Sequence, residues 1–327
     1  MVDPSPGETI QALAEKHDFT ISEALSLEQA ERADLVVLAI KVQAADTVAA
    51  HLNQVMRDDT ALLSTIAGVS LNRLALAFGD RPIMRAIPNT ASEIGAGVTV
   101  CVANEAGDAL EAGQETLATA IGEALSGLER LVVLGGGHET AFGSFQGLRQ
   151  AHPKARIGIL NLDAHLDLRL PGEAGGSSGT PFGQIRDLDP EGFDYLCVGY
   201  AEESNTQALL KRAQDWGVGL VRDHELIADP LAAHPAITDL IARNDCLYLT
   251  IDIDVLSHFQ APGVSAPAAR GIPLSTIEQI VSFAIKTAAS LQTPLALADL
   301  VELSPSHDRD GVTAKTAALL ARRLLMS

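Results

Sequence analysis

The chain has 327 residues, of which 47% are hydrophobic and 20% are charged, a composition typical of a globular protein with a substantial core. Acidic residues outnumber basic ones by 42 to 23, and the resulting net charge of −19 repels phosphate backbones, so nucleic-acid binding is not expected. No secretory signal or membrane-spanning run is recognisable and the 3 cysteines are scattered, so we expect a cytoplasmic protein without a membrane partner.

Short apolar runs alternate with amphipathic stretches along the chain. The apolar runs predict strands at 33–40, 61–67, 82–87, 97–102, 131–134, 156–162, 195–198, 219–221, 246–251 and 294–300. Amphipathic stretches predict helices at 105–125, 206–216, 273–290 and 311–325. The strand runs are continuous rather than alternating, which is typical of strands covered on both faces. The predicted fold class is therefore α/β, a parallel sheet with helices on both faces.

The first hundred residues carry motifs of their own. ADLVVLAIKVQ (33–43), LLSTIAGVSLNRL (62–74) and RPIMRAIPNTASEIGAGVT (81–99) resemble the pyrroline-5-carboxylate reductase family, where they belong to a Rossmann-type domain. The glycine-rich turn that cradles a dinucleotide is not recognisable, so reductase activity is not expected. We predict a truncated Rossmann-like segment at 1–103 and a second domain at 104–327.

Three later segments each join an apolar strand to metal-ligand residue types. They read LVVLGGGHE (131–139), IGILNLDAHLDLR (157–169) and LYLTIDIDVL (247–256). Alternate residues of an extended chain point to one face, and the carboxyl ends of parallel strands meet at one edge. We therefore expect six side chains to converge there: His138, Asp163, His165, Asp167, Asp252 and Asp254.

Four crowded carboxylates repel one another unless cations lie among them. Oxygen ligands with some imidazole suit Mn²⁺ or Mg²⁺ better than zinc. Six such groups are enough for two ions, which at a separation of roughly 3.5–4 Å can activate water at neutral pH. Taken alone, each Asp-x-Asp is equally well a loop cap and the histidine a turn residue. Together the segments favour metal-assisted hydrolysis.

GGGHE, NLDAHLDLR, SSGTPFGQI, LTIDIDVL and DLVELSP together resemble the arginase/agmatinase (ureohydrolase) family from about residue 104 to the end. GSFQGL (143–148) and APGVSAPAARGIPL (261–274) resemble its formimidoylglutamase branch in particular. The resemblance implies an arginase-like three-layer core that lacks the family's usual first section. It also implies cleavage of N-formimino-L-glutamate by water into L-glutamate and formamide, a step of histidine degradation.

The same resemblance implies two Mn²⁺ per subunit. The ligands of one ion would be His138, Asp163, Asp167 and Asp252, and those of the other Asp163, His165, Asp252 and Asp254. Asp163 and Asp252 would thus bridge the ions and take part in catalysis. Glu302, in DLVELSP, would face the amidine nitrogens of the substrate.

Arg169 lies two residues after Asp167, where arginases carry a small amide. A guanidinium favours a substrate with carboxylates, although a solvated loop arginine is the alternative. Ser178 and Thr180 are further candidates for binding the substrate carboxylates. Phe182 falls where arginases place a proton-shuttling histidine, which counts against arginase itself.

Two other functions stay open. A guanidino compound such as agmatine or guanidinobutyrate would release urea instead of formamide. Alternatively, the chain is an inactive fusion of two truncated enzymes that retains only metal binding. The expected partners are a small-molecule substrate and divalent metal, and a homo-oligomer is compatible with this interpretation.

Overall fold

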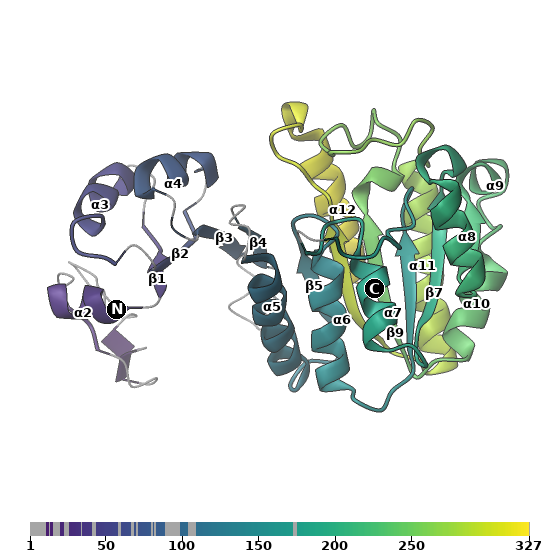
Figure 1. The fold of residues 1–327 in the computed structure, drawn as a ribbon, viewed down its shortest axis with the longest axis horizontal. Helices are drawn as coiled ribbons and strands as arrows, with labels where there is room; N and C mark the ends of the chain where they lie inside the picture. Colours follow the sequence, from purple (N-terminus) through teal and green to yellow (C-terminus); the bar gives the residue numbers. More distant parts are fainter. Residues whose placement is uncertain are drawn as a thin grey trace. The chain divides into compact units, whose positions relative to one another are not determined.

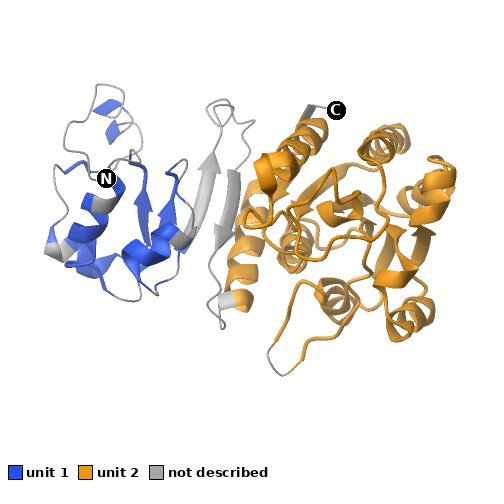
Figure 2. Cartoon of the chain, turned by 90° about the horizontal axis from the view of Figure 1, so that it is seen from above, with its two compact units in different colours: residues 1–88, 102–104 blue, residues 89–101, 105–327 orange. Residues whose placement is uncertain are grey.

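The computed structural model describes residues 11–12, 14–15, 20–22, 26–33, 35–40, 44–57, 60–66, 69, 71–79, 81, 83–88, 99–103, 109–172 and 175–326. The chain divides into two compact units (Figure 2). Unit 1 contains residues 1–88 and 102–104, and unit 2 contains residues 89–101 and 105–327. None of the described helices is long and apolar enough to cross a membrane.

Unit 1 alternates helices and strands. In chain order these are α2 (Leu27–Arg32), β1 (Leu35–Leu38), α3 (Ala45–Leu52), β2 (Ala61–Ser64), α4 (Leu71–Phe78) and β3 (Ile83–Pro88). The three strands are parallel and neighbour one another in chain order. They share a small apolar core with α3 and α4 that includes Leu38, Leu52, Leu62 and Leu74.

Unit 2 contains a parallel sheet in the order β4-β5-β10-β9-β6-β7-β8, to which β4 contributes residues 99–101. Its strands are β4 (Thr99–Ala103), β5 (Leu131–Leu134), β6 (Ile157–Leu162), β7 (Asp194–Tyr200), β8 (Gly219–Arg222), β9 (Cys246–Asp252) and β10 (Leu295–Val301). Its helices are α5 (Ala109–Leu125), α6 (Thr140–Ala151), α7 (Pro181–Leu188), α8 (Gln207–Asp215), α9 (Asp223–Ala228), α10 (His234–Ala242), α11 (Leu274–Leu291) and α12 (Val312–Met326).

The helices of unit 2 form two layers around the sheet (Figure 1). One apolar cluster joins α5, α6, α7 and α8 to one face of the sheet. A second cluster joins α9, α10, α11 and α12 to the opposite face. Every residue of β6, β9 and β10 is buried, because both faces of these strands are covered. The predicted parallel sheet with helices on both faces is confirmed.

Local signals in the sequence account for several helix ends. The Thr206 side chain accepts a hydrogen bond from the backbone N–H of Leu209 and so caps α8. Pro181 stands in the first turn of α7, where its missing N–H costs nothing. Gln292 ends α11 in the left-handed conformation.

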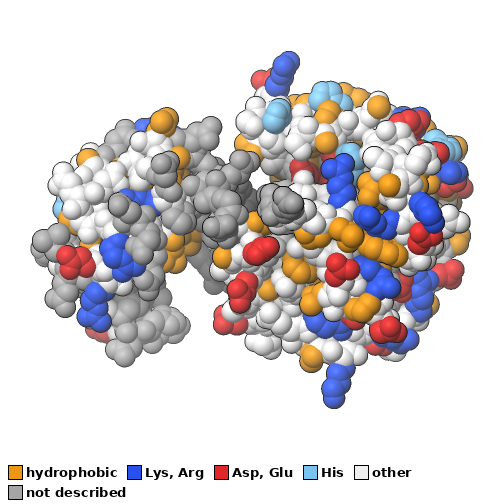
Figure 3. Space-filling model, in the orientation of Figure 1, with side chains coloured by type: hydrophobic (Ala, Val, Ile, Leu, Met, Phe, Trp, Pro, Cys, Tyr) orange, Lys and Arg blue, Asp and Glu red, His pale blue; other side chains and the backbone are white. Residues whose placement is uncertain are grey.

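Acidic and basic side chains are interspersed over the face of unit 2 that Figure 3 shows. They do not gather there into one basic patch. A mixed surface of this kind offers no electrostatic footprint for a nucleic acid on that face.

Two glycines of the GSFQGL motif let α6 approach α5 closely. A Cβ on Gly147 would lie 2.6 Å from the carbonyl oxygen of Ala118, and a Cβ on Gly143 would lie 2.9 Å from that of Gln114. Backbone atoms cannot yield as a flexible side chain can. The two glycines are therefore required by helix packing.

This packing predicts opposite effects for two glycine-to-alanine changes. Gly147→Ala should lower the free energy of unfolding by about 1–3 kcal/mol, because the new methyl group overlaps α5. Gly113→Ala is the matched control: it lies in α5 with nothing within 4 Å of its Cβ position. Helix propensity alone should make that variant more stable by up to about 1 kcal/mol. Urea denaturation of both variants would contradict the packing argument if Gly147→Ala were as stable as Gly113→Ala.

Candidate metal centre

The six predicted ligands all lie at the carboxyl-terminal edge of the sheet in unit 2. His138 follows β5, and Asp163, His165 and Asp167 lie on the segment after β6. Asp252 is the last residue of β9. Asp254 lies in the short helix η4 (Ile253–Val255) that follows it.

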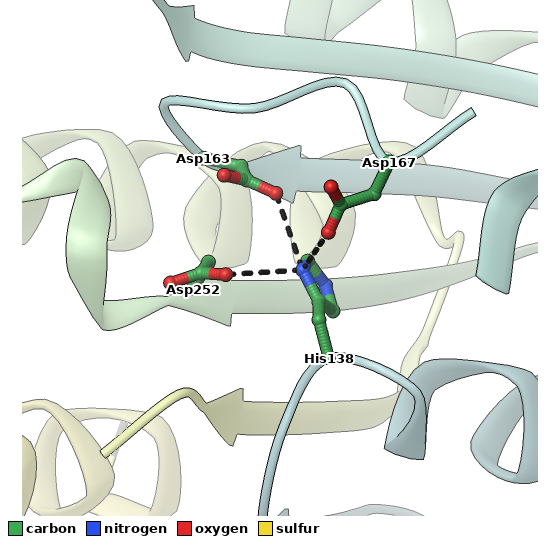
Figure 4. Close-up of side chains that lie close together, drawn as sticks. All are labelled: His138, Asp163, Asp167 and Asp252. Atoms are coloured by element: carbon green, nitrogen blue, oxygen red, sulfur yellow. Dashed lines mark ion pairs between the residues drawn. The ribbon is translucent and has the colours of Figure 1, made fainter. Parts of the chain in front are cut away.

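His138 is the meeting point of three carboxylates (Figure 4). Its Nδ1 lies 3.2 Å from Asp163 Oδ2, 3.0 Å from Asp167 Oδ2 and 3.2 Å from Asp252 Oδ2. The imidazole is fully buried, as is the Asp163 carboxylate. These four residues form one group that could hold a metal ion.

A second group of three shares Asp163 with the first. The Nδ1 atom of His165 lies 3.0 Å from Asp254 Oδ2 and 3.6 Å from Asp163 Oδ1. Asp163 therefore stands between the two groups, as a bridging ligand must. Asp252 belongs to the first group, and its Oδ1 accepts the backbone N–H of Asp254 at 2.8 Å.

The backbone orients these carboxylates. One oxygen of Asp163 accepts the N–H of His165 at 2.6 Å, two residues further along. The corresponding bond from Asp254 to Asp252 is of the same kind, and such local bonds are typical of aspartates in turns. In both Asp163 and Asp252 the second oxygen, Oδ2, is thereby directed at His138.

Burial, like charge and hydrogen bonds between imidazoles and carboxylates together set the acid–base properties of the centre. Burial raises the pKa of Asp252 well above its usual value, and it raises the pKa of Asp254 to about 6. Burial opposes a positive charge on His165, but hydrogen bonds to Asp163 and Asp254 outweigh it and raise the pKa to about 12. Four carboxylates close together in one buried site therefore strongly favour the binding of positive charge.

The donor set fits divalent cations. Its carboxylate oxygens and imidazole nitrogens suit Mn²⁺. Within the described chain, the buried polar atoms without a hydrogen-bond partner include His138 Nδ1 and Asp254 Oδ1, one from each group. Both atoms have the lone pairs that a metal ion requires.

Glu302 lies beside the centre, directly after β10. Its Oε1 accepts the backbone N–H of His138 at 2.8 Å, and its Oε2 accepts the hydroxyl of Ser265 at 3.1 Å. Glu302 and Asp167 have φ angles of 65° and 47°, in the left-handed region that non-glycine residues rarely occupy. Strained conformations of this kind are concentrated at functional sites.

The three predicted substrate-binding residues differ in their surroundings. Arg169 and Ser178 are exposed, and the backbone N–H of Arg169 donates to Gly179 O at 2.9 Å, which places Arg169 beside the loop of Ser178. Thr180, in contrast, is only 3% exposed. Its hydroxyl lies 2.8 Å from Ser177 O and 2.9 Å from Gln184 Oε1. The Thr180 hydroxyl is therefore hydrogen-bonded within its own loop in this structure.

Phe182 forms part of the wall around His138. It is fully buried, stacks on Tyr195 at 4.4 Å between ring centroids, and meets the His138 ring edge-on at 5.2 Å. At this position the chain therefore packs a hydrocarbon ring against a metal-ligand candidate.

Three polar residues next to the centre were not predicted. Asn161 Nδ2 donates to Asp163 Oδ2 at 3.0 Å, and Thr250 Oγ1 lies 3.1 Å from His138 Nε2. Ser265 is the hydroxyl donor to Glu302. A signal for the first two exists in the sequence, because each interrupts an apolar strand two residues before an aspartate ligand.

Comparison with known proteins gives the class. The arginase family matches residues 69–327, so the chain belongs to the arginase family. This match begins ahead of residue 104, from which the motifs predicted it. Arginase from Bacillus subtilis has the same fold, with a TM-score of 0.58 and 24% identity over 67% of this chain and 80% of that one.

Relatives of higher identity are more specific. The chain is 43% identical to a formimidoylglutamase of Hahella chejuensis over 267 residues, which cover 79% of this chain and 81% of the relative. It is 42% identical to a formimidoylglutamase of Klebsiella pneumoniae over 278 residues, with 82% and 85% covered. The formimidoylglutamase of Bacillus subtilis shares the fold with a TM-score of 0.57, 22% identity and 65% of each chain covered.

The metal centre predicts two Mn²⁺ per chain and a large gain in stability on binding. Any ligand that binds only the folded state stabilises it by mass action, by about 4 kcal/mol at a thousandfold excess over Kd. Asp163→Asn should bind fewer than two ions, because Asp163 belongs to both groups. Asp245→Asn, which alters an exposed ion pair with Arg156, should bind two. Metal analysis and thermal unfolding with and without manganese provide the test. The proposed metal centre is refuted if Asp163→Asn binds as many ions, and gains as much stability from manganese, as the control.

Proposed function

We propose that this chain is a dinuclear manganese hydrolase that converts N-formimino-L-glutamate and water into L-glutamate and formamide. The convergence of six ligand side chains at one edge of the sheet carries the proposal. Relatives that are 41–46% identical over most of the chain carry the name formimidoylglutamase. The enzyme class is therefore a hydrolase of carbon–nitrogen bonds in linear amidines.

The metal ligands follow from the two groups. His138, Asp163, Asp167 and Asp252 would hold one manganese ion, and Asp163, His165, Asp252 and Asp254 the other. Sharing of Asp163 between the groups supports its bridging role. Asp252 belongs to the first group, and its assignment to the second ion as well follows from the resemblance to the family. When bound, the two manganese ions would supply Lewis-acid stabilisation and a nucleophilic water at neutral pH.

Glu302 would orient the amidine. A carboxylate offers about four lone-pair directions, of which two are used by the His138 backbone and Ser265. The remaining directions can accept N–H groups of the formimino nitrogen, in charge-assisted hydrogen bonds that oppose rotation of the planar group. Glu302 therefore holds the amidine carbon toward the metal centre.

Arg169 would bind a carboxylate of the glutamate portion. The side chain is exposed two residues after Asp167, on the segment that carries three of the candidate ligands. Ser178 is exposed in the loop beside it and would add a hydroxyl donor. Thr180 contributes by holding that loop in shape.

Phe182 bears on the proton balance of the reaction. Cleavage leaves an amine nitrogen on glutamate that must gain a proton, and a phenyl ring cannot donate one. That proton therefore comes from solvent or from another group. A buried phenyl ring against His138 also excludes water from one side of the ligand.

We further propose that residues 1–103 form a Rossmann-like segment similar to pyrroline-5-carboxylate reductase, ahead of a hydrolase domain at 104–327. The parallel strands β1 and β2, with α3 between them, support this assignment. Residues 1–68 lie outside the arginase-family match. The matched residues of the reductase motif at 41–43 and 89–98 lie outside the described part of the chain.

A product assay separates the candidate functions. Manganese-loaded protein should release formamide from N-formimino-L-glutamate, and it should release little urea from agmatine or guanidinobutyrate, because neither carries the two carboxylates that Arg169 favours. Preference for a guanidino compound would assign the chain to that branch of the family. A protein that binds two ions and turns over none of these substrates would be a metal-binding relic.

Arg169→Met should raise KM for N-formimino-L-glutamate by about tenfold or more and change kcat little, since the lost contact binds ground state and transition state alike. Lys154→Met, an exposed change after α6, is the control for loss of a positive charge. Steady-state kinetics with an unchanged KM in Arg169→Met would leave Arg169 as a solvated loop residue.

Glu302→Gln should lower kcat/KM by about a hundredfold, because a neutral amide orients a cationic amidine poorly. Manganese content should stay at two, because Glu302 is outside both ligand groups. Ser265→Ala removes one hydrogen bond to Glu302 and should give a smaller loss in the same direction. Full activity in Glu302→Gln would exclude an orienting role for the negative charge of Glu302.

A further inference from the structure

A row of polar side chains lies buried beneath the metal centre. Asp299 of β10 pairs in register with Thr250 of β9, and Thr250 pairs in register with Asn161 of β6. All three residues have 0% exposure. Because neighbours in register on parallel strands point to the same face of a sheet, the three side chains form one row across it.

This row lies directly under the ligands. Asp163 follows Asn161 by two residues and Asp252 follows Thr250 by two, so each pair shares a face of its strand. Tyr248 precedes Thr250 by two residues and occupies the apolar cluster below. From the core to the edge, β9 thus presents a tyrosine, a threonine and then a metal-ligand candidate.

His138 connects the ligands to the buried row. One ring nitrogen, Nδ1, faces the three carboxylates, and the other, Nε2, lies 3.1 Å from Thr250 Oγ1. To bind a metal ion, Nδ1 must offer a lone pair, so the ring proton has to reside on Nε2. That N–H then donates to Thr250, whose own hydroxyl proton is left for another acceptor.

Asp299 is placed to be that acceptor. It is the register neighbour of Thr250, and its Oδ2 accepts a hydrogen bond from the Tyr248 hydroxyl. Burial raises the pKa of the Asp299 carboxyl, whereas hydrogen bonds from Thr250 and Tyr248 act against that rise. The other oxygen of Asp299, Oδ1, is buried without a hydrogen-bond partner, so it is free to accept the Thr250 hydroxyl.

We propose that Asp299 and Thr250 are positioning residues of the metal centre. They hold His138 with its proton on Nε2 and the lone pair of Nδ1 directed at the ion. The inference rests on the proposed dinuclear function and adds to it two residues that touch neither ion nor substrate. Partners of this kind behind a histidine ligand change metal affinity by about 10–100-fold.

A purely structural role is the competing explanation. The Tyr248 hydroxyl also lies 3.4 Å from the carbonyl oxygen of Ala141 in α6, so the Tyr248–Asp299 pair could serve only to join α6 to the sheet. In that case, loss of Asp299 would weaken the fold without selecting one ion over the other. A measurement that treats the two ions separately distinguishes the explanations.

The test uses four variants of the full chain and one control. His138→Ala identifies the ion that depends on the imidazole. Thr250→Val removes the acceptor at nearly constant volume, Thr250→Ser keeps it, and Asp299→Asn keeps an acceptor oxygen without the charge. Thr293→Val is the control, since its buried hydroxyl bonds to Ile241 O and Asn244 O at the opposite end of β10. Manganese is titrated into each metal-free protein and followed by the electron paramagnetic resonance of the free ion. Urea denaturation of the metal-free proteins reports the fold.

We expect Thr250→Val and Asp299→Asn to lower the affinity for one manganese ion by about 10–100-fold and to leave the affinity for the other unchanged. The weakened ion should be the one that His138→Ala loses. Thr250→Ser and Thr293→Val should bind both ions as the native chain does. Native affinity in both Thr250→Val and Asp299→Asn, or an equal loss of affinity for both ions, would overturn this inference. Neither result would overturn the proposed function. A native chain that binds no pair of manganese ions would overturn the proposed function together with this inference.

Discussion

Mutual repulsion among four carboxylates at one closed edge of a parallel sheet is the constraint on which the rest of the site depends. Asp163, Asp252 and Asp254 are buried, and only 14% of the Asp167 side chain is exposed. Such a group is stable only with positive charge inside it. The two imidazoles, the turns that aim each oxygen and the covering helix layers all serve to hold that charge in place.

The fold class and the convergence of the six candidate ligands could be predicted because both depend on local patterns. A continuous apolar run that ends in Asp or His indicates both a parallel strand and its carboxyl-terminal end. His138 and Asp252 are far apart in the chain, yet each marks a strand end, and parallel pairing brings strand ends together. The arginase-family membership then follows from motifs that contain these same residues.

Side-chain direction within loops and strands could not be predicted in this way. Thr180 belongs to a polar loop whose composition suits substrate binding, but its hydroxyl turns back onto Ser177 and Gln184. Thr250 and Asp299 were counted within apolar strands, because a single polar residue does not alter the run. Their importance appears only when the register of β9 and β10 is known.

The six candidate metal ligands come from three segments that meet only through strand pairing across β5, β10, β9 and β6. An unfolded or half-assembled chain therefore presents no more than two or three of these groups together. Manganese uptake by the proposed centre would then report completed assembly: the number of ions retained by a preparation would measure the fraction of chains whose strands have reached their final alignment. In a cell, the same dependence would make loading the last event in maturation.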